Sequence, residues 1–338
     1  MTKLVLEKNA KRPKYLLLSD GITKQIAEGQ MVLGQKLPSV NKLSEAFNFS
    51  RETVFKALFH LSEKGIVKAV DKIGYFVSDV SPETDFRVFF MLDKFTAFKE
   101  NLFTSLLKAL GDRAKVSMYF HHQNVELFET LILKNFKNYT HFVITTYINE
   151  SEVLNEVLDK IPPEKLIIVD KYEPNLSKGH GMIYQDFEND IFNALSDNID
   201  LIRKYAKLIL IDHENAPHGA FVKAGFDKFC KEHKCIGAVH SSLSPGHFKK
   251  GNLYITIDAY DRDVVEIIKL VRAKKWKLGN QIGLISYNDT PTKEILDGGI
   301  TVISTDFKKM GEVAAKMILS GNLVQKPNVT KVILRNSL

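Results

Sequence analysis

From residue 87 onward, short apolar runs alternate with amphipathic stretches, and this alternation constrains the fold more than any other feature of the chain. Four runs, "RVFFML", "KVSMYF", "HFVITT" and "KLIIVD", begin near residues 87, 115, 141 and 165. Four more, "KLILID", "CIGAVH", "LYITID" and "IGLIS", begin near residues 207, 235, 253 and 282. Apolar runs separated by helical patterns are typical of βαβ units and parallel sheets. The two groups predict an α/β body of two lobes, each a doubly wound parallel sheet.

A different pattern precedes this body. Residues 14–79 contain three short helical patterns and then "IVKAVDKIGYFV", which predicts a β-hairpin with its turn near 71–74. Only "NFS" separates the second helical pattern from the third. Asn48 tolerates the left-handed backbone of a tight helix end, and Ser50 is a good cap for the next helix. Two helices joined in this way form a helix-turn-helix, and the hairpin makes it a winged one (α+β).

The polar stretch "SDVSPETD", residues 78–85, separates the two patterns and predicts a linker. We therefore expect one domain over residues 1–79, a linker over 80–86 and a second domain over 87–338. Within the body, lobe one is expected to comprise about 87–184 and 290–324. Lobe two is expected to comprise about 185–289 and 325–338.

The positive charge of the chain is concentrated in its N-terminal part. Residues 1–80 hold 13 Lys and Arg against 8 Asp and Glu, a net charge of +5 out of +7 for the whole chain. A basic domain on a nearly neutral body indicates that the domain meets a polyanion. Helix spacing alone does not separate DNA binding from a small structural unit, and this charge asymmetry favours DNA.

The third helical pattern supplies the candidate DNA contacts. Val54 belongs to its buried stripe, which leaves Arg51, Thr53 and Lys56 free to meet base edges and phosphates. At the hairpin tip, Lys72 and Gly74 suit the neighbouring phosphates or the minor groove.

This N-terminal part of the chain also resembles the winged helix-turn-helix domain of GntR-type bacterial transcription regulators. The motifs "G-x-K-L-P-S", "S-R-x-T-V" and "G-Y-F-V" occur in the order of that family within residues 13–77. The resemblance implies DNA contacts at Ser39, Ser50, Arg51, Thr53 and Lys56, and a wing tip at Gly74. The family usually has Glu-Arg after "PS", where this chain has "VN", so an arginine that often contacts DNA is missing.

Polar side chains follow many of the predicted strands of the body, where a doubly wound sheet binds ligands. Carboxylates and amides suit a neutral polyhydroxylated ligand, and aromatic rings can cover the apolar side of a sugar. For any single residue, a helix cap or core packing is an equally open explanation. The polar candidates are Asp93, Thr145, Asp170, Asp261, Asn288 and Asp289, and the aromatic ones Phe95, Phe98, Phe221 and Tyr260.

The body resembles the LacI/GalR sugar-sensing domain, which has the fold of periplasmic binding proteins. The matching stretches are "FVKAGFDKF" and "IGLISYNDTPTKEILDGGITVISTDFKKMGEVAAKMIL". In this resemblance the effector-binding arginine of the family falls on Lys223, its cleft asparagine on Tyr260, and its paired acids on Asn288 and Asp289. The combination is similar to arabinose-repressor-like and fucose-operon regulators. It implies operator DNA, a pentose or 6-deoxyhexose effector, and a homodimer matching a two-fold operator.

Other classes of protein lack support in the sequence. The chain has no apolar run long enough to span a bilayer, and its start does not read as a secretory signal, so we expect a cytoplasmic protein without membrane contact. Two cysteines in "CKEHKC" and scattered histidines predict no metal, cofactor or catalytic site. The alternatives are a sugar-binding protein for transport, which would have the same body fold, and a sugar-processing enzyme.

Overall fold

The computed structural model describes residues 13–71, 73–78, 86–148, 151–176, 179–213, 218–243, 246, 248–257 and 261–338. The chain divides into two compact units. The first, here called the head, runs to Arg87 and includes Asp112–Lys115; the second, the body, comprises Val88–Gly111 and Val116–Leu338. Most of the predicted linker lies outside the described residues, and its last residue, Phe86, already begins a strand.

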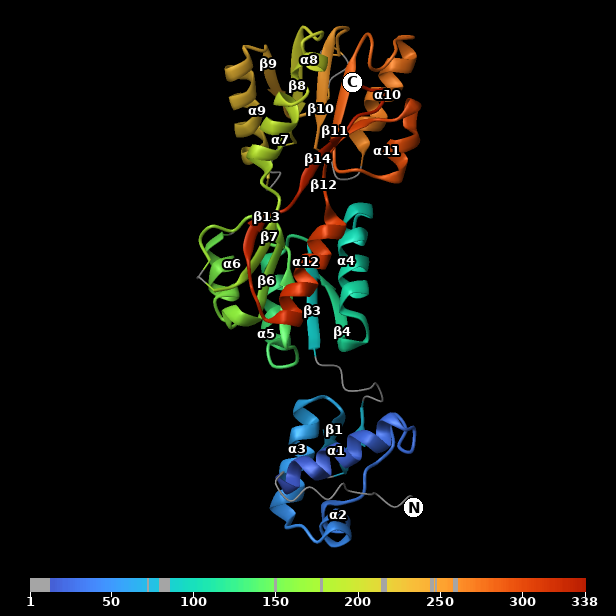
Figure 1. Ribbon diagram of the computed structural model, residues 1–338, viewed down its shortest axis with the longest axis vertical. Coiled ribbons are helices and arrows are strands. Elements are labelled where there is room, and N and C mark those ends of the chain that lie inside the picture. The colour runs from blue at the N-terminus through green and yellow to red at the C-terminus, as the bar shows by residue number, and fades with distance from the viewer. Residues whose placement is uncertain are drawn as a thin grey trace. The chain divides into compact units, whose positions relative to one another are not determined.

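The head has the three helices and the hairpin expected from the sequence. These are α1 (Lys14–Ala27), α2 (Val40–Phe47), α3 (Arg51–Glu63), β1 (Val67–Val70) and β2 (Gly74–Val77), with β1 and β2 antiparallel (Figure 1). Leu18, Ile22, Leu43, Val54 and Leu58 are at most 1% exposed and form the centre of its core. These residues recur at helical spacing, which is why the three helices bury one face each.

The first lobe of the body is a six-stranded sheet in the order β13-β7-β6-β5-β3-β4. Its strands are β3 (Phe86–Leu92), β4 (Ala114–Phe120), β5 (His141–Ile144), β6 (Leu166–Asp170), β7 (Gly181–Tyr184) and β13 (Gln325–Pro327). Its helices are α4 (Ala97–Leu110), α5 (Val125–Asn135), α6 (Ser151–Leu158) and α12 (Phe307–Ser320), with short 3₁₀ turns at Gly111–Arg113 and Pro163–Lys165. Figure 1 shows the helices flanking the sheet, as in doubly wound folds.

The second lobe repeats this plan with the order β14-β12-β11-β10-β8-β9. Its strands are β8 (Lys207–Ile211), β9 (Gly237–His240), β10 (Asn252–Thr256), β11 (Gly283–Tyr287), β12 (Thr301–Thr305) and β14 (Thr330–Ile333), of which β14 is antiparallel. Its helices are α7 (Phe187–Ser196), α8 (Ile199–Ile202), α9 (Gly219–His233), α10 (Arg262–Ala273) and α11 (Pro291–Ile295), with a 3₁₀ turn at Leu296–Gly298. Gly225 lets α9 approach α7, because a Cβ there would lie 2.1 Å from the Glu188 carbonyl oxygen.

The sheet pairing corrects the expected lobe boundaries at two places. Residues 290–324 were assigned to lobe one, yet β12 pairs with β11 in the sheet of lobe two, and only α12 beyond it packs on α4 of lobe one. Conversely, β13 was assigned to lobe two and pairs with β7 of lobe one. Both strands lie beside a chain crossing between the lobes, and hydrophobic pattern alone does not say on which side of a crossing a strand pairs.

Candidate DNA-binding surface and effector cleft

The second helix of the helix-turn-helix begins with a capped and exposed turn. Ser50 Oγ accepts a hydrogen bond from the backbone N–H of Thr53 at 3.2 Å and lies 2.8 Å from Thr53 Oγ1. Asn48 closes α2 in the left-handed conformation with φ 52°. Arg51, the first residue of α3, is exposed. A capped helix end that presents an exposed arginine is suited to a phosphate or a base edge.

The other predicted DNA residues have more varied surroundings. Ser39 caps α2 by accepting from the N–H of Lys42 at 3.3 Å. The Lys56 ammonium lies 4.7 Å from the centre of the Tyr15 ring, so part of its positive charge is held against the head itself. Gly74 has a φ of 131°, which favours glycine at the start of the wing strand. Lys72 lies outside the described residues.

Two exposed aromatic residues of α3 were missed by the sequence reasoning. Phe55 and Phe59 are 46% and 61% exposed and follow Arg51 at four-residue spacing. That spacing puts all three on one helix face, beside the buried stripe of Val54 and Leu58. The pattern was visible in the sequence as two large apolar residues outside the buried stripe.

A small cavity of about 60 Å³ lies between the two lobes of the body. Both lobes contribute to it, and four of the predicted effector residues, Asp93, Phe98, Asp170 and Asn288, line it. The further lining residues are Lys94, Lys99, Gln123, Tyr147 and Gln185 from lobe one, and Phe187, His218, Ile257 and Tyr287 from lobe two.

A buried lysine organises the lobe-one wall of this cavity. Lys99, only 2% exposed, forms an ion pair with Asp93, and its Nζ lies 3.4 Å from Asp170 Oδ2. The same ammonium lies 4.7 Å from the centre of the Tyr147 ring. Burial raises the pKa of Asp170, while the charge of Lys99 opposes that rise. Lys99 was not among the predicted site residues.

Neighbouring polar groups hold the two carboxylates in place. The backbone N–H of Asp93 donates to Thr145 Oγ1 at 3.0 Å, and Gln185 donates to Asp170 Oδ1. Asp170 adopts a positive φ of 79° at the end of β6. Thr145 is fully buried, so it positions Asp93 and is not part of the cavity wall.

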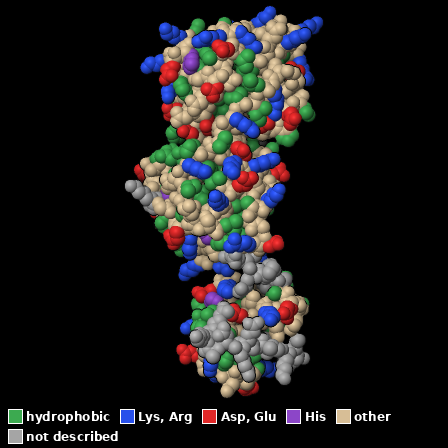
Figure 2. Space-filling view, in the orientation of Figure 1, with side chains coloured by type: hydrophobic (Ala, Val, Ile, Leu, Met, Phe, Trp, Pro, Cys, Tyr) green, Lys and Arg blue, Asp and Glu red, His purple; other side chains and the backbone are tan. Residues whose placement is uncertain are grey.

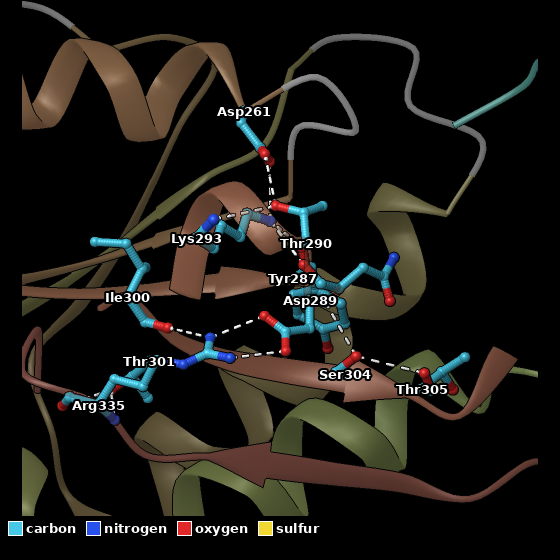
Figure 3. A network of polar contacts seen from close by, with 11 residues as sticks. Asp261, Tyr287, Asp289, Thr290, Lys293, Ile300, Thr301, Ser304, Thr305 and Arg335 are labelled. Carbon is cyan, nitrogen blue, oxygen red and sulfur yellow. Dashed lines mark hydrogen bonds and ion pairs between the residues drawn. The ribbon is translucent and has the colours of Figure 1, made fainter. Parts of the chain in front are cut away.

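The polar network of lobe two corrects two predicted effector residues (Figure 3). Asp261 lies 2.9 Å from the ammonium of Lys293 and accepts from Thr290 Oγ1 at 3.1 Å. Both oxygens of Asp289 accept from the Arg335 guanidinium at 2.8 Å. Asp289 lines a separate hollow with Thr290, and neither carboxylate is among the lining residues of the cavity between the lobes. Each of these two carboxylates forms an ion pair with a cation of lobe two.

Three more predicted residues lie elsewhere, and one is not described. Phe95 is 47% exposed and meets Phe120 edge to face at 6.3 Å. Phe221 is 43% exposed and lines another hollow beside the linking segment at 185–188. Lys223 forms an ion pair one helical turn away with Asp227. Tyr260 lies outside the described residues.

Asp190 on α7 carries an unusual carboxyl group near the lobe crossing. Burial raises its pKa to about 7, and one of its oxygens has no hydrogen-bond partner among the described residues. The raised pKa contributes stability that is fully present at low pH and is lost as the pH rises through about 7. Neutral asparagine does not titrate. We expect the advantage of Asp190→Asn in the free energy of unfolding to grow by about 2–3 kcal/mol between pH 5 and pH 8.

Urea denaturation at several pH values measures this change. Asp200→Asn, which removes an exposed carboxyl of the same lobe, is the control. A pH-independent difference between Asp190→Asn and the wild type would contradict the prediction.

No helix in the part of the chain that the structure describes is long and apolar enough to cross a membrane. The same residues contain no group of three His, Cys, Asp or Glu side chains placed to hold a metal ion. Figure 2 shows basic and acidic side chains interspersed over the visible face of the body, in keeping with its small net charge.

The chain thus joins a winged helix-turn-helix head to a two-lobed body with a cavity. The comparisons identify each part. Residues 14–77 match the family described as "Bacterial regulatory proteins, gntR family", and the head is therefore a GntR-type DNA-binding domain.

Two curated relatives are similar to the head region. The chain is 34% identical over 77 residues to an uncharacterized HTH-type transcriptional regulator, YhdI, of Bacillus subtilis (strain 168), covering 23% of this chain and 16% of the relative. It is 37% identical over 71 residues to the arabinose metabolism transcriptional repressor of Geobacillus stearothermophilus, covering 21% and 20%. The chain thus matches a fifth or less of each relative.

The body is similar to solved LacI-type structures. One is a LacI family transcriptional regulator from Lactobacillus casei with bound glucose, at a TM-score of 0.59 and 16% identity. The match covers 75% of this chain and 99% of that chain. At this identity the likeness shows the fold alone, which the body shares with these structures. Both matched groups are described as regulatory proteins.

Proposed function

We propose that this protein is a sequence-specific bacterial transcription regulator whose operator affinity depends on a small carbohydrate bound between the lobes of its body. The observation that carries the proposal is the union, in one chain, of a GntR-type head and a LacI-type body with a polar cavity. Such a regulator works on the chromosome, so the expected cytoplasmic location is part of the proposal.

The chemistry of the cavity supports a carbohydrate as the effector. Asp93 and Asp170 offer carboxylate oxygens that accept from sugar hydroxyls, and the rings of Phe98 and Phe187 offer apolar surface. The regulator from Lactobacillus casei holds glucose, and the relative from Geobacillus stearothermophilus serves arabinose metabolism. The proposal extends this class of ligand to the present chain, with a pentose or a 6-deoxyhexose as the first candidates.

The effector acts only through its preference for one of two states of the protein. A coupling free energy of about 1–3 kcal/mol, typical of allosteric proteins, changes operator affinity about 5–150-fold. A homodimer belongs to the proposal because two heads related by a two-fold axis match a pseudo-palindromic operator. The site residues taken to act are Arg51 and Thr53 in the head, and Asp93, Phe98, Asp170 and Asn288 in the body.

A sugar-binding protein for transport is the second candidate, because the body fold is shared with periplasmic binding proteins. The head argues against it, since transport needs no DNA-binding domain. Retention of duplex DNA separates the two functions directly.

A two-part experiment tests the proposal. The purified protein is first screened for a rise in unfolding temperature with free monosaccharides and their phosphates. It is then used to capture genomic fragments at low salt, with and without each stabilising sugar. We expect a sugar that stabilises the protein and also changes DNA retention. A protein that retains no duplex under any of these conditions would overturn the proposal.

A further inference from the structure

Three polar atoms on the lobe-two wall of the cavity are buried without a hydrogen-bond partner among the described residues. They are His218 Nδ1, Tyr287 Oη and Asn288 Oδ1, and all three residues line the cavity. A buried polar atom left unpaired costs about 1–3 kcal/mol, and such atoms are uncommon in native proteins. His218 precedes α9 and Asn288 follows β11, so two segments distant in the chain each place an unpaired polar atom on this wall.

The local structure holds both side chains in defined positions. The ring of His218 is stacked on Phe187 at 5.0 Å and meets Tyr147 of lobe one edge to face at 6.0 Å. Asn288 has a positive φ of 58°, and its backbone carbonyl accepts from the buried Lys293 ammonium at 2.8 Å. Neither side chain needs large reorganisation to meet a ligand, which lowers the entropy cost of binding.

The facing wall of lobe one is electrically balanced. Two carboxylates, Asp93 and Asp170, and two ammonium groups, Lys94 and Lys99, line the cavity, and Lys99 already pairs with both acids. Burial together with the charges of Lys94 and Lys99 lowers the pKa of His218 to about 4, so its ring is neutral at neutral pH. The two acids and the two ammonium groups sum to no net charge, and His218 adds none, so the cavity offers a phosphate or carboxylate no excess of positive charge.

We infer that the cavity binds an uncharged polyhydroxylated molecule, a free sugar and not a sugar phosphate, whose hydroxyl groups pair with His218 Nδ1 and Asn288 Oδ1. A hydroxyl both donates and accepts, so it satisfies an amide oxygen and a neutral imidazole nitrogen alike. A phosphate oxygen only accepts and would face the Asn288 oxygen and two carboxylates. The inference rests on the proposed function, because it names which carbohydrates the effector site takes and which atoms select them.

Two variants test the assignment of the atoms. His218→Phe keeps the stacking on Phe187 and removes both ring nitrogens. Asn288→Gly keeps the positive φ and removes the amide. Each is expected to bind the sugar at least tenfold more weakly, with the unfolding temperature of the ligand-free protein unchanged or higher, because an unpaired polar atom is lost. A purely structural role would instead lower that temperature and leave sugar affinity intact.

Tyr205→Phe is the matched control. Its hydroxyl is another unpaired buried atom of lobe two, and Tyr205 does not line the cavity. It should bind the sugar as the wild type does.

Isothermal titration of the wild type and the three variants with L-arabinose, D-xylose, L-fucose and D-glucose, and with arabinose 5-phosphate and glucose 6-phosphate, gives the result. A free sugar that binds the wild type at least tenfold more tightly than its phosphate supports the inference. Equal binding of the phosphate, or wild-type affinity in both cavity variants, overturns it and leaves the proposed function standing. If none of the six compounds binds the wild type, the carbohydrate effector itself is rejected.

Discussion

Replacing Lys99 by methionine is expected to lower the free energy of unfolding of the body by about 3–5 kcal/mol. The reason is the pair of acids beside it. Asp93 and Asp170 are 2% and 1% exposed, and the lysine is the cation placed between them. Without it, two carboxylates remain buried close together and lose the ammonium that lies between them, a large penalty in a medium of low polarity. Denaturation by urea, followed by circular dichroism, measures the loss.

Two comparisons give this prediction its specificity. Lys309→Met removes a lysine of an exposed ion pair with Glu312 at 3.2 Å, and should cost at most about 1 kcal/mol. Adding Asp93→Asn and Asp170→Asn to the Lys99→Met variant should restore much of the lost stability, because the uncompensated charges are then gone. A single Lys99→Met variant as stable as Lys309→Met would show that the buried ion pairs do not organise this wall.

Replacing Arg51 by alanine is expected to weaken binding to the preferred duplex by about 1–3 kcal/mol, or about 5–150-fold. Arg51 is exposed at the capped start of α3, where side chains of a recognition helix meet base edges. The duplex is first selected from genomic fragments with the wild-type protein, and the affinities are then compared by gel shift at one fixed salt concentration. The loss should be largest on the selected duplex and smaller on unrelated DNA.

Lys231→Ala is the matched control, because it removes one positive charge from an exposed position on α9 in the body. It should leave the affinity for the selected duplex within about twofold of the wild type, since it has no part in base recognition. Equal gel shifts for Arg51→Ala and the wild type would count against α3 as the recognition helix.

The head was predictable from its sequence because its decisive interactions are local. Ser50 caps the helix that follows it, and Asn48 takes the left-handed conformation at the preceding helix end. Each of these features depends on residues no more than a few positions apart. The three helices and the hairpin consequently occur where the apolar spacing and the turn residues predicted them.

The effector site was predictable only in part, because several acids at strand ends have the same local pattern. Asp93 and Asp289 each follow a buried strand closely. The first lines the cavity, whereas the second is bound by Arg335, 46 residues further along the chain. Lys99 lines the cavity but was not predicted, because a lysine in an amphipathic helix ordinarily indicates a solvent-exposed face. Here it lies buried between acids from two different strands.

Short-range pattern in the sequence was sufficient for the class of each domain, the alternation of strands and helices, and the recognition helix with its cap, since spacing and propensity act within a few residues. Only the folded structure shows that β12 pairs with β11 and β13 with β7, and that Lys99 is buried. It also shows that His218 and Asn288 line the same cavity as Asp93. Several of those features arise where segments far apart in the chain meet, as β13 meets β7 and Lys99 meets Asp170. The free energy of such contacts comes from packing and desolvation, which no local stretch of residues specifies.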